Sequence, residues 1–301
     1  MAYHVDHMTL SQANDTSASR RTALFRETAA DLAERWSLGL AYALMPARIG
    51  GLPGLAKLCF EELLAPNHAL PDPERTLASP AGLAGIAHDL SVPTLLEAYR
   101  RGLYPLAHIA PQKWWSPPQR SLLFFPELHI AKRLRRQMRQ GQYTVTFDRD
   151  FEGVITSCAG RRSGRWHVTW ITPKVMHAYA ALFDAGHAHS FEVWNEKGEL
   201  AGGGYGVAIG GAFVTESQFS HEPNTSKIGF TVLNWHLAHW GFAFNDGKLI
   251  TTPTREMGFR EIPRGDFLAR LAQAVKQPDR TGRWQVEIDL ATVADWQPAK
   301  P

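Results

Sequence analysis

Three strand-like segments follow one another between residues 190 and 216, with helical patterns on both sides of them. The second and third, Glu199–Ile209 and Ala212–Glu216, are separated by Gly210-Gly211, which is typical of a tight hairpin turn. Strands joined by a hairpin are antiparallel, so this part of the chain is not a repeated βαβ unit. We therefore expect a mixed α+β fold.

Further elements follow from the spacing of apolar residues and from residues that start or end helices. Residues 1–68 read as a separate helical extension without recognisable chemistry. Helices are expected at Thr22–Trp36, Leu55–Leu64, Thr94–Arg101, Leu128–Arg139, Phe151–Cys158, Pro173–Ala185, Ser226–Trp240 and Arg264–Val275. The remaining extended segments are expected at Tyr143–Phe147, Ser190–Trp194, Phe242–Phe244 and Lys248–Thr251.

Composition narrows the class of protein. Of the 301 residues, 44% are apolar and 20% are charged, close to the average of globular domains, and no apolar run approaches the roughly 20 residues of a membrane span. Two distant cysteines, Cys59 and Cys158, exclude a disulfide scaffold and a cysteine-rich zinc module. Residues 1–20 lack the pattern of a secretory signal, so we expect a cytoplasmic protein without a membrane partner.

The expected helix Leu128–Arg139 concentrates positive charge. At 100° per residue, one sector of about 100° holds four cations, and apolar residues occupy the opposite side. Like charges at these spacings weaken a helix by tenths of a kcal/mol each, so a polyanion or acidic residues elsewhere in the fold must offset the repulsion. The four cations are Lys132, Arg135, Arg136 and Arg139.

Common cofactor and metal motifs are not found. No Walker A loop is present, and the glycine-rich stretch 202–206 lies inside a strand pattern, where it indicates a bulge. His187 and His189 share one face of a strand, but no third ligand stands near them in the sequence. There is no GxSxG motif, and Cys158 has no motif partner. We expect neither a metal nor a cofactor.

Nine short motifs occur together in a characteristic order: AYRRGLYP at 98–105, WWSP at 114–117, FPELH at 125–129, TWITP at 169–173, GHAHS at 186–190, YGVA at 205–208, ESQFS at 216–220, NTSK at 224–227 and EIPR at 261–264. With these motifs the chain resembles the leucyl/phenylalanyl-tRNA–protein transferases from about Leu70 to Leu271. Each motif alone is weakly specific, whereas nine in order are strongly specific.

The resemblance implies an enzyme of the N-degron pathway. Such enzymes move leucine or phenylalanine from aminoacyl-tRNA to the N-terminal amine of acceptor proteins, usually those beginning with a basic residue. It also implies a small N-terminal domain at 69–122, a GNAT-like (acetyltransferase-type) catalytic domain at 123–277 and a C-terminal tail at 278–301. The four cations of the basic helix would then hold the tRNA acceptor stem.

The resemblance assigns the catalytic centre to Asp246 and Glu216. The donor is an activated ester and the attacking group is an amine, so the reaction needs positioning and charge stabilisation rather than a metal or a covalent intermediate. An aspartate of ordinary pKa is a poor base for an ammonium. We therefore expect Asp246 to orient the amine and Glu216 to anchor the substrate amino group.

Further substrate-binding residues follow from the same resemblance. Trp170 is expected to stack on the terminal adenosine, with Trp115 as a second candidate ring. Ser220 and Asn224 belong to motifs that line the site, although Asn224 could equally cap the helix that follows it.

Four departures from the family pattern affect these expectations. Lys248 stands where the family has Gln; it cannot accept hydrogen bonds, and could pair with Asp246 or polarise the carbonyl. Gly204 and Gln218 replace two apolar pocket residues and predict a roomier, more polar pocket, which leaves open the amino acid transferred. Leu106 replaces a tryptophan and removes one stacking ring.

Two alternatives remain open at this point. The same departures fit a catalytically altered tRNA-binding protein of the same fold. A GNAT-like topology alone would also fit an acyl-CoA-dependent N-acetyltransferase, but the pyrophosphate loop of that class, [Arg/Gln]-x-x-Gly-x-[Gly/Ala], does not occur in the sequence.

Overall fold

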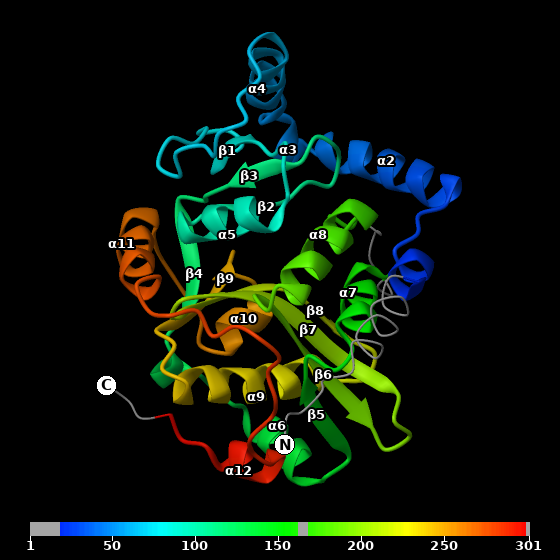
Figure 1. The fold of residues 1–301 in the computed structure, drawn as a ribbon, viewed down its shortest axis with the longest axis vertical. Coiled ribbons are helices and arrows are strands. Elements are labelled where there is room, and N and C mark those ends of the chain that lie inside the picture. The colour runs from blue at the N-terminus through cyan, green and yellow to red at the C-terminus, as the bar shows by residue number, and fades with distance from the viewer. Residues whose placement is uncertain (1–18, 162–167, 299–301) are drawn as a thin grey trace, which may run out of the picture.

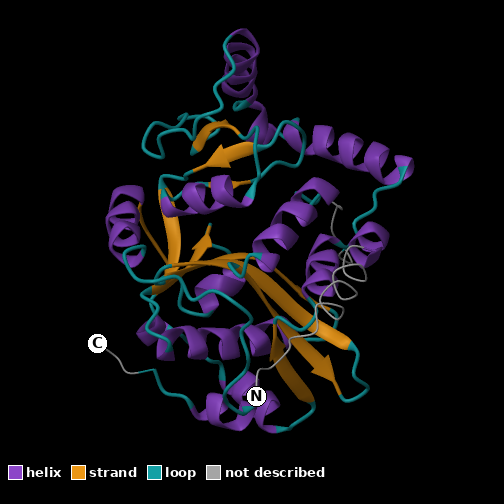
Figure 2. Ribbon diagram, viewed as in Figure 1, coloured by secondary structure: helices purple, strands orange, loops and turns teal. Residues whose placement is uncertain are grey.

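The computed structural model describes residues 19–161 and 168–298. Two sheets organise these residues: a three-stranded sheet of order β1-β3-β2 and a seven-stranded sheet of order β10-β4-β9-β8-β7-β6-β5. Helices surround both sheets (Figures 1 and 2), which confirms the expected mixed α+β class.

The large sheet is antiparallel except where β8 runs parallel to β9. The predicted hairpin joins β7 to β8, and Gly210 adopts the positive φ of 52° that its turn requires. Its strands are β4 Gln119–Leu123, β5 Tyr143–Phe147, β6 Ala188–Asn195, β7 Leu200–Ile209, β8 Ala212–Ser220, β9 Phe244–Lys248 and β10 Arg260–Pro263.

Helices cover the two faces of this sheet. One face carries α7 (Phe151–Ala159) and α8 (Pro173–Asp184), and the other carries α9 (Thr225–His239), which forms the crossover from β8 to β9 (Figure 1). All three helices begin and end within two residues of the bounds predicted from the sequence.

The small sheet consists of β1 (Leu83–Ile86), β2 (Tyr104–Pro105) and β3 (Lys113–Trp115), with α5 (Val92–Arg100) beside it. Helix α5 packs on α8 and β7, so this region shares one hydrophobic core with the large sheet. The domain boundary expected at residue 122 falls inside β4, a strand of the large sheet.

The extension folds differently from the prediction at its start. The single helix predicted over Thr22–Trp36 is wrong: a helical stretch ends at residue 24, and α2 (Ala29–Ala43) begins anew. The break has a local cause, because the Thr28 hydroxyl accepts the Asp31 amide and the Asp31 carboxylate accepts the Thr28 amide, which forms a capping box. Helices α3 (Pro46–Ile49) and α4 (Leu52–Leu64) follow.

The C-terminal part returns to the base of the molecule. After α11 (Arg264–Ala274), the chain places Trp284 flat against His189, with 3.6 Å between ring centroids, and ends the described region with α12 (Leu290–Asp295). Helix α12 lies against α6 (Lys132–Arg139), the basic helix, which begins at Lys132 rather than at Leu128 as predicted (Figure 1). Several elements were not predicted from the sequence: β1–β4, α3, η1 (Phe125–Glu127), α10 (Thr252–Glu256), β10 and α12. The two extended segments predicted at Phe242–Phe244 and Lys248–Thr251 are wrong, because a single strand, β9, runs from Phe244 to Lys248.

Within the described ranges, no helix combines the length and the apolar character that crossing a membrane would need.

Candidate active site

A buried ion pair fixes the strand that carries Asp246. The Arg120 guanidinium, on β4, donates to both Asp246 oxygens at 2.7–2.9 Å, and the side chains of the two residues are 2% and 1% exposed. The Arg120 guanidinium also lies 4.8 Å from the Tyr104 ring centroid. The Asp246 carboxylate is therefore enclosed and already satisfied. This geometry corrects the expectation that Asp246 meets the incoming amine directly.

Asp246 instead shapes the backbone of Lys248. Its Oδ1 atom accepts the Lys248 amide at 2.7 Å, and Lys248 has a φ of 63°, in the left-handed region that side chains rarely adopt. The sequence Asp246-Gly247 favours such a turn because an aspartate readily accepts the amide two residues on. This turn ends the strand and aims the Lys248 side chain back across the sheet.

The Lys248 ammonium pairs with Glu216 and not with Asp246, the ion-pair partner considered from the sequence. Its Nζ atom lies 2.7 Å from Glu216 Oε2 and 3.3 Å from the Glu216 carbonyl oxygen. The ammonium also lies 5.3 Å from the ring centroids of Tyr104 and Trp170. Two charges and two aromatic faces thus form one compact centre.

Glu216 reaches this centre because β8 is bulged. Tyr205 pairs with Ser217 and Gly206 with Thr215, so Glu216 is an extra residue with no partner of its own on β7. Its other oxygen, Oε1, accepts the Tyr99 hydroxyl at 2.7 Å. Each carboxylate oxygen of Glu216 therefore has one of these two partners, Lys248 or Tyr99, and keeps capacity to accept a further hydrogen bond.

Three tyrosines form the wall behind Glu216. The hydroxyls of Tyr99 and Tyr179 lie 2.5 Å apart, and the Tyr205 ring packs on Tyr179. Burial, and then the negative charge of Glu216, hold the pKa of the Tyr99 and Tyr179 hydroxyls well above the usual value. These groups stay neutral and hold Glu216 in place. The sequence analysis missed Arg120 and Tyr179, whereas Tyr99 and Tyr104 lie in the AYRRGLYP motif.

Two other predicted substrate residues, Gly204 and Gln218, lie on the other face of the large sheet. A Cβ atom on Gly204 would meet the Phe191 ring at 2.7 Å, and Phe191 in turn contacts Gly229 of α9. Gln218 pairs directly with Gly204 and so points the same way. The expectation of extra room at Gly204 is wrong, because Phe191 and the Ser217 carbonyl oxygen fill that space.

Ser220 and Asn224 connect the end of β8 to the basic helix. The Ser220 hydroxyl donates to the Ser226 hydroxyl at 2.7 Å and accepts the Ser226 amide at 3.1 Å, so Ser220 caps α9. Asn224 makes no capping hydrogen bond and donates instead to Gln137 of α6 at 3.1 Å. The basic helix α6 therefore lies next to the C-terminal end of β8, on the far side of Ser220 from Glu216.

The four cations of α6 do not form one solvent-facing set. The Arg135 guanidinium donates to the Ala294 and Trp296 carbonyl oxygens at 2.5 and 2.8 Å, and Arg139 pairs with Asp295. Lys132 and Arg136 are exposed. The helical wheel is therefore wrong for Arg135, because α12, an element that it cannot include, lies over that side.

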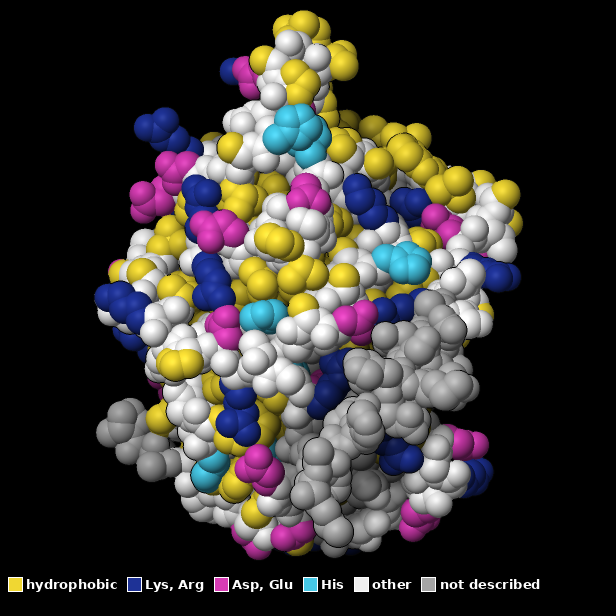
Figure 3. All heavy atoms as spheres, in the orientation of Figure 1, with side chains coloured by type: hydrophobic (Ala, Val, Ile, Leu, Met, Phe, Trp, Pro, Cys, Tyr) yellow, Lys and Arg dark blue, Asp and Glu magenta, His cyan; other side chains and the backbone are white. Residues whose placement is uncertain are grey.

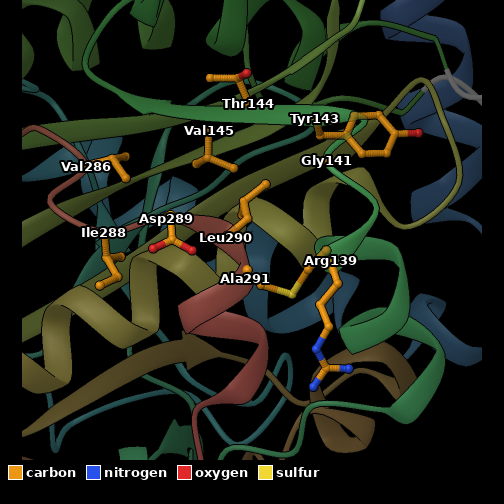
Figure 4. A pocket seen from close by; sticks show the side chains of 11 residues that line it. Arg139, Gly141, Tyr143, Thr144, Val145, Val286, Ile288, Asp289, Leu290 and Ala291 are labelled. Carbon is orange, nitrogen blue, oxygen red and sulfur yellow. The ribbon is translucent and has the colours of Figure 1, made fainter.

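A cavity of about 320 Å³ separates the C-terminal segment from β5 beside α6. Figure 4 shows the apolar side chains of Val145, Val286 and Leu290 around this cavity, whereas the Arg139 guanidinium turns away from them. Asp289 also lines this cavity, so its lining combines apolar groups with one acid and one base.

Trp115 lines a different cavity, of about 310 Å³, near Lys248. Its indole donates to the Leu106 carbonyl oxygen at 2.8 Å, and Tyr104 and Leu249 also line the space. Over residues 19–161 and 168–298, no group of three or more His, Cys, Asp or Glu side chains could hold a metal ion.

Together, the mixed sheet and its enclosed carboxylate–ammonium centre define an α+β enzyme. A family model described as leucyl/phenylalanyl-tRNA protein transferase matches residues 122–272, and a second, for the N-terminal domain of that transferase, matches residues 88–118. The chain belongs to the leucyl/phenylalanyl-tRNA protein transferase family. This confirms the resemblance inferred from the nine motifs.

Curated relatives agree with the family models. The chain is 43% identical over 230 residues to a leucyl/phenylalanyl-tRNA–protein transferase of Alkalilimnicola ehrlichii, a match that covers 76% of this chain and 89% of the relative. For proteins of the same name from Anaeromyxobacter sp. and Azotobacter vinelandii, the identities are 44% and 42%, over 73% and 76% of this chain and 92% and 95% of the relatives. A structure of L-PGS from Bacillus licheniformis aligns with 52% of this chain and 50% of its own, at 11% identity and a TM-score of 0.31.

Proposed function

We propose that this enzyme transfers leucine, phenylalanine or a similar apolar residue from aminoacyl-tRNA to the N-terminal amine of an acceptor protein. Family membership supports this reaction. The structural observation that most strongly supports it is the buried Glu216–Lys248 ion pair beside Trp170. The acceptors begin with a basic residue and are thereby marked for degradation by the N-degron pathway. The reaction takes place in the cytoplasm, where aminoacyl-tRNA is available.

The chemistry requires only groups that this centre supplies. The amine nitrogen attacks the ester carbonyl carbon, the new N–C bond forms, and the ester C–O bond to the ribose breaks. The proton released by the amine ends on the ribose oxygen. Lys248 stabilises the negative charge that develops on the carbonyl oxygen. Two of the three N–H donors of the Lys248 ammonium bond to Glu216, and the third remains for the substrate.

Glu216 and Asp246 have different parts in this scheme. Glu216 receives the donor's α-amino group at the edge of its Tyr99–Lys248 cluster. Asp246 is a positioning residue, because it reaches the reaction only through the Lys248 backbone and Arg120. Trp170 supplies a ring for the terminal adenosine.

The other assignments from sequence complete the proposal. Lys132, Arg136 and Arg139 meet the phosphates of the tRNA acceptor stem, and Arg135, which binds the Ala294 and Trp296 carbonyl oxygens, adds its positive charge beside them. We also propose an extension (1–68), a small N-terminal domain (69–122), a GNAT-like domain (123–277) and a tail (278–301). The separate three-stranded sheet supports a small N-terminal domain that ends before β4, the strand of the large sheet that begins at Gln119.

The test is transfer from total charged tRNA to peptides that differ in their first residue, read by mass spectrometry. Lys248→Met should reduce transfer at least a hundredfold because it removes the ammonium, whereas Lys248→Gln should retain part of the activity because an amide still donates. Lys276→Ala, a change at an exposed lysine, is the matched control.

The outcomes separate the candidate functions. Addition of leucine or phenylalanine to the peptides establishes the proposal. Retention of tRNA without any addition would favour a catalytically altered tRNA-binding protein. Acetylation of peptides with acetyl-CoA would favour the acetyltransferase instead.

A further inference from the structure

The cavity beside Lys248 has two walls of different origin. Tyr42, Arg48, Leu52 and Leu55 of the helical extension form one wall. The other belongs to the small sheet and the loop between β2 and β3. Since the family models begin at residue 88, the first wall lies outside both matches. A volume of about 310 Å³ is within the usual range of roughly 300–1,000 Å³ for small-molecule sites.

Aromatic rings meet across the two walls. The Tyr42 ring lies edge-on to the His108 ring at a centroid distance of 5.1 Å, and the Arg48 guanidinium stacks 3.9 Å above the Tyr42 ring. His108 Nδ1 is buried, and no described residue gives it a hydrogen-bond partner. An unsatisfied polar atom beside aromatic rings suits a flat ligand that carries its own hydrogen-bonding groups.

The charge of the cavity narrows the ligand class. Arg48 and Lys113 are both cationic, and no Asp or Glu is among the described residues that line the space. The buried Lys113 ammonium donates to the Ile109 and Pro111 carbonyl oxygens, so no carboxylate neutralises it there. A basic peptide side chain would be repelled, whereas a flat heterocycle bearing a phosphate fits both the rings and the charge.

The cavity also shares a residue with the catalytic centre. Tyr104 lines it, and the same ring lies 5.3 Å from Lys248 Nζ. Leu249, the residue after Lys248, lies at its edge and is 53% exposed. A ligand in this cavity would therefore lie next to the Lys248 ammonium.

We propose that this cavity binds a nucleotide of the donor RNA's 3′ end, and that Tyr42 and Arg48 of the extension are positioning residues for it. The inference rests on the proposed function. The base lies against the wall that the Tyr42 and His108 rings form together, and Arg48 meets a phosphate. The extension thereby supplies an aromatic surface next to Leu106, the position at which a stacking ring is missing.

The experiment measures donor and acceptor KM separately in the full-length enzyme, with phenylalanyl-tRNA and a peptide as substrates. Tyr42→Ala and Arg48→Ala should each raise the donor KM about fivefold or more and leave kcat and the acceptor KM unchanged. Arg48→Lys should restore most of the loss. The matched controls Phe60→Ala and Lys57→Ala, at exposed positions of α4, should change neither KM. Inhibition by the trinucleotide CCA should weaken in the Tyr42 and Arg48 variants alone.

Three results would overturn this inference. A rise in acceptor KM alone would make the cavity an acceptor site, and unchanged constants in both variants would remove any role for it. Equal effects of the α4 controls would show a general effect of the extension. If the wild-type enzyme neither bound tRNA nor transferred an amino acid, the proposed function would fail, and this inference with it.

Discussion

The helical extension and the transferase body stabilise themselves in different ways. Helix α2 buries only Gly39, and α3 and α4 bury no residue, whereas α9 alone buries ten. Among the residues that the structure describes, eight of the nine exposed large hydrophobic side chains lie between Leu32 and Leu64. Figure 3 shows yellow atoms along α2 and at the tip of α4. The body therefore owes its stability to its own core, and the extension is free to contribute a surface.

Two kinds of contact hold the extension to the body. Before α2, Phe25 is buried in the main core and Arg21 pairs with Glu152 and Asp184, whereas α2 and α4 make close glycine contacts. A Cβ atom on Gly39 would meet the Ile109 side chain at 2.6 Å, and one on Gly54 would meet the Ser79 carbonyl oxygen at 2.2 Å. These glycines allow two helices to approach the small sheet closely, and they do so beside the proposed nucleotide cavity. The difference between the two regions suggests that the extension serves a ligand rather than the stability of the fold.

The largest predicted difference between the body and the extension concerns the loss of stability when an ion pair is broken. Arg120→Leu leaves the Asp246 carboxylate buried without a partner, which should cost about 3–5 kcal/mol in the free energy of unfolding and abolish transfer. Arg161→Ala breaks the pair with Glu34 between body and extension, where both side chains are solvent-accessible. It should leave the urea midpoint unchanged within error.

A double variant separates charge from packing. Arg120→Leu combined with Asp246→Leu should recover part of the lost stability but none of the activity, because no charge is then left unpaired. If Arg120→Leu unfolds at the wild-type urea concentration, or if Arg161→Ala is the more damaging change, the body does not depend on its buried pair as described.

The second prediction compares two leucines of opposite exposure. Leu95 of α5 is fully buried, so Leu95→Ala should destabilise the protein by about 2–5 kcal/mol. Leu40 of α2 is 56% exposed, and Leu40→Ala should change the free energy of unfolding by less than about 0.5 kcal/mol. Urea denaturation measures both. Similar losses for the two variants would contradict the division into a packed body and a peripheral extension.

The same contrast explains which elements could be predicted from the sequence. Tyr143–Phe147 was predicted at its observed bounds, because alternation along one strand is a local signal. In contrast, β4 is a strand only through its pairing with β9 and β10, which lie more than 100 residues further along the chain. The break before α2 did have a local signal, the Thr28–Asp31 pair, which was overlooked.

The sequence predicted which residues form the candidate site, but not which of their side chains pair with one another. The resemblance supplied Glu216, Asp246 and Lys248, but Arg120 decides their arrangement by occupying Asp246 from 126 residues away. Because Arg120 already pairs with Asp246, the Lys248 ammonium pairs with Glu216. Likewise, a helical wheel cannot anticipate that α12 covers Arg135, because that contact joins residues 159 positions apart.

The smallest predicted effect lies at the contact between the two regions, at His108. Burial, and then the charge of Arg48, lower the pKa of the His108 imidazole to about 4, below the usual value of about 6.5. Between these two values the unfolded chain binds a proton that the folded chain does not, so stability falls as the pH is lowered from about 6.5 to 4 and is unaffected by this group above 6.5.

His108→Gln should therefore flatten the stability profile between pH 6.5 and 4 by an amount on the order of 1 kcal/mol, because glutamine does not titrate there. Arg48→Ala should raise the pKa of His108 towards 6.5, since it removes a neighbouring positive charge, and NMR titration of the imidazole would record the shift. Lys57→Ala should leave the titration unchanged. If Arg48→Ala does not move the midpoint, Arg48 does not act on His108, and the extension does not form the cationic wall of the cavity.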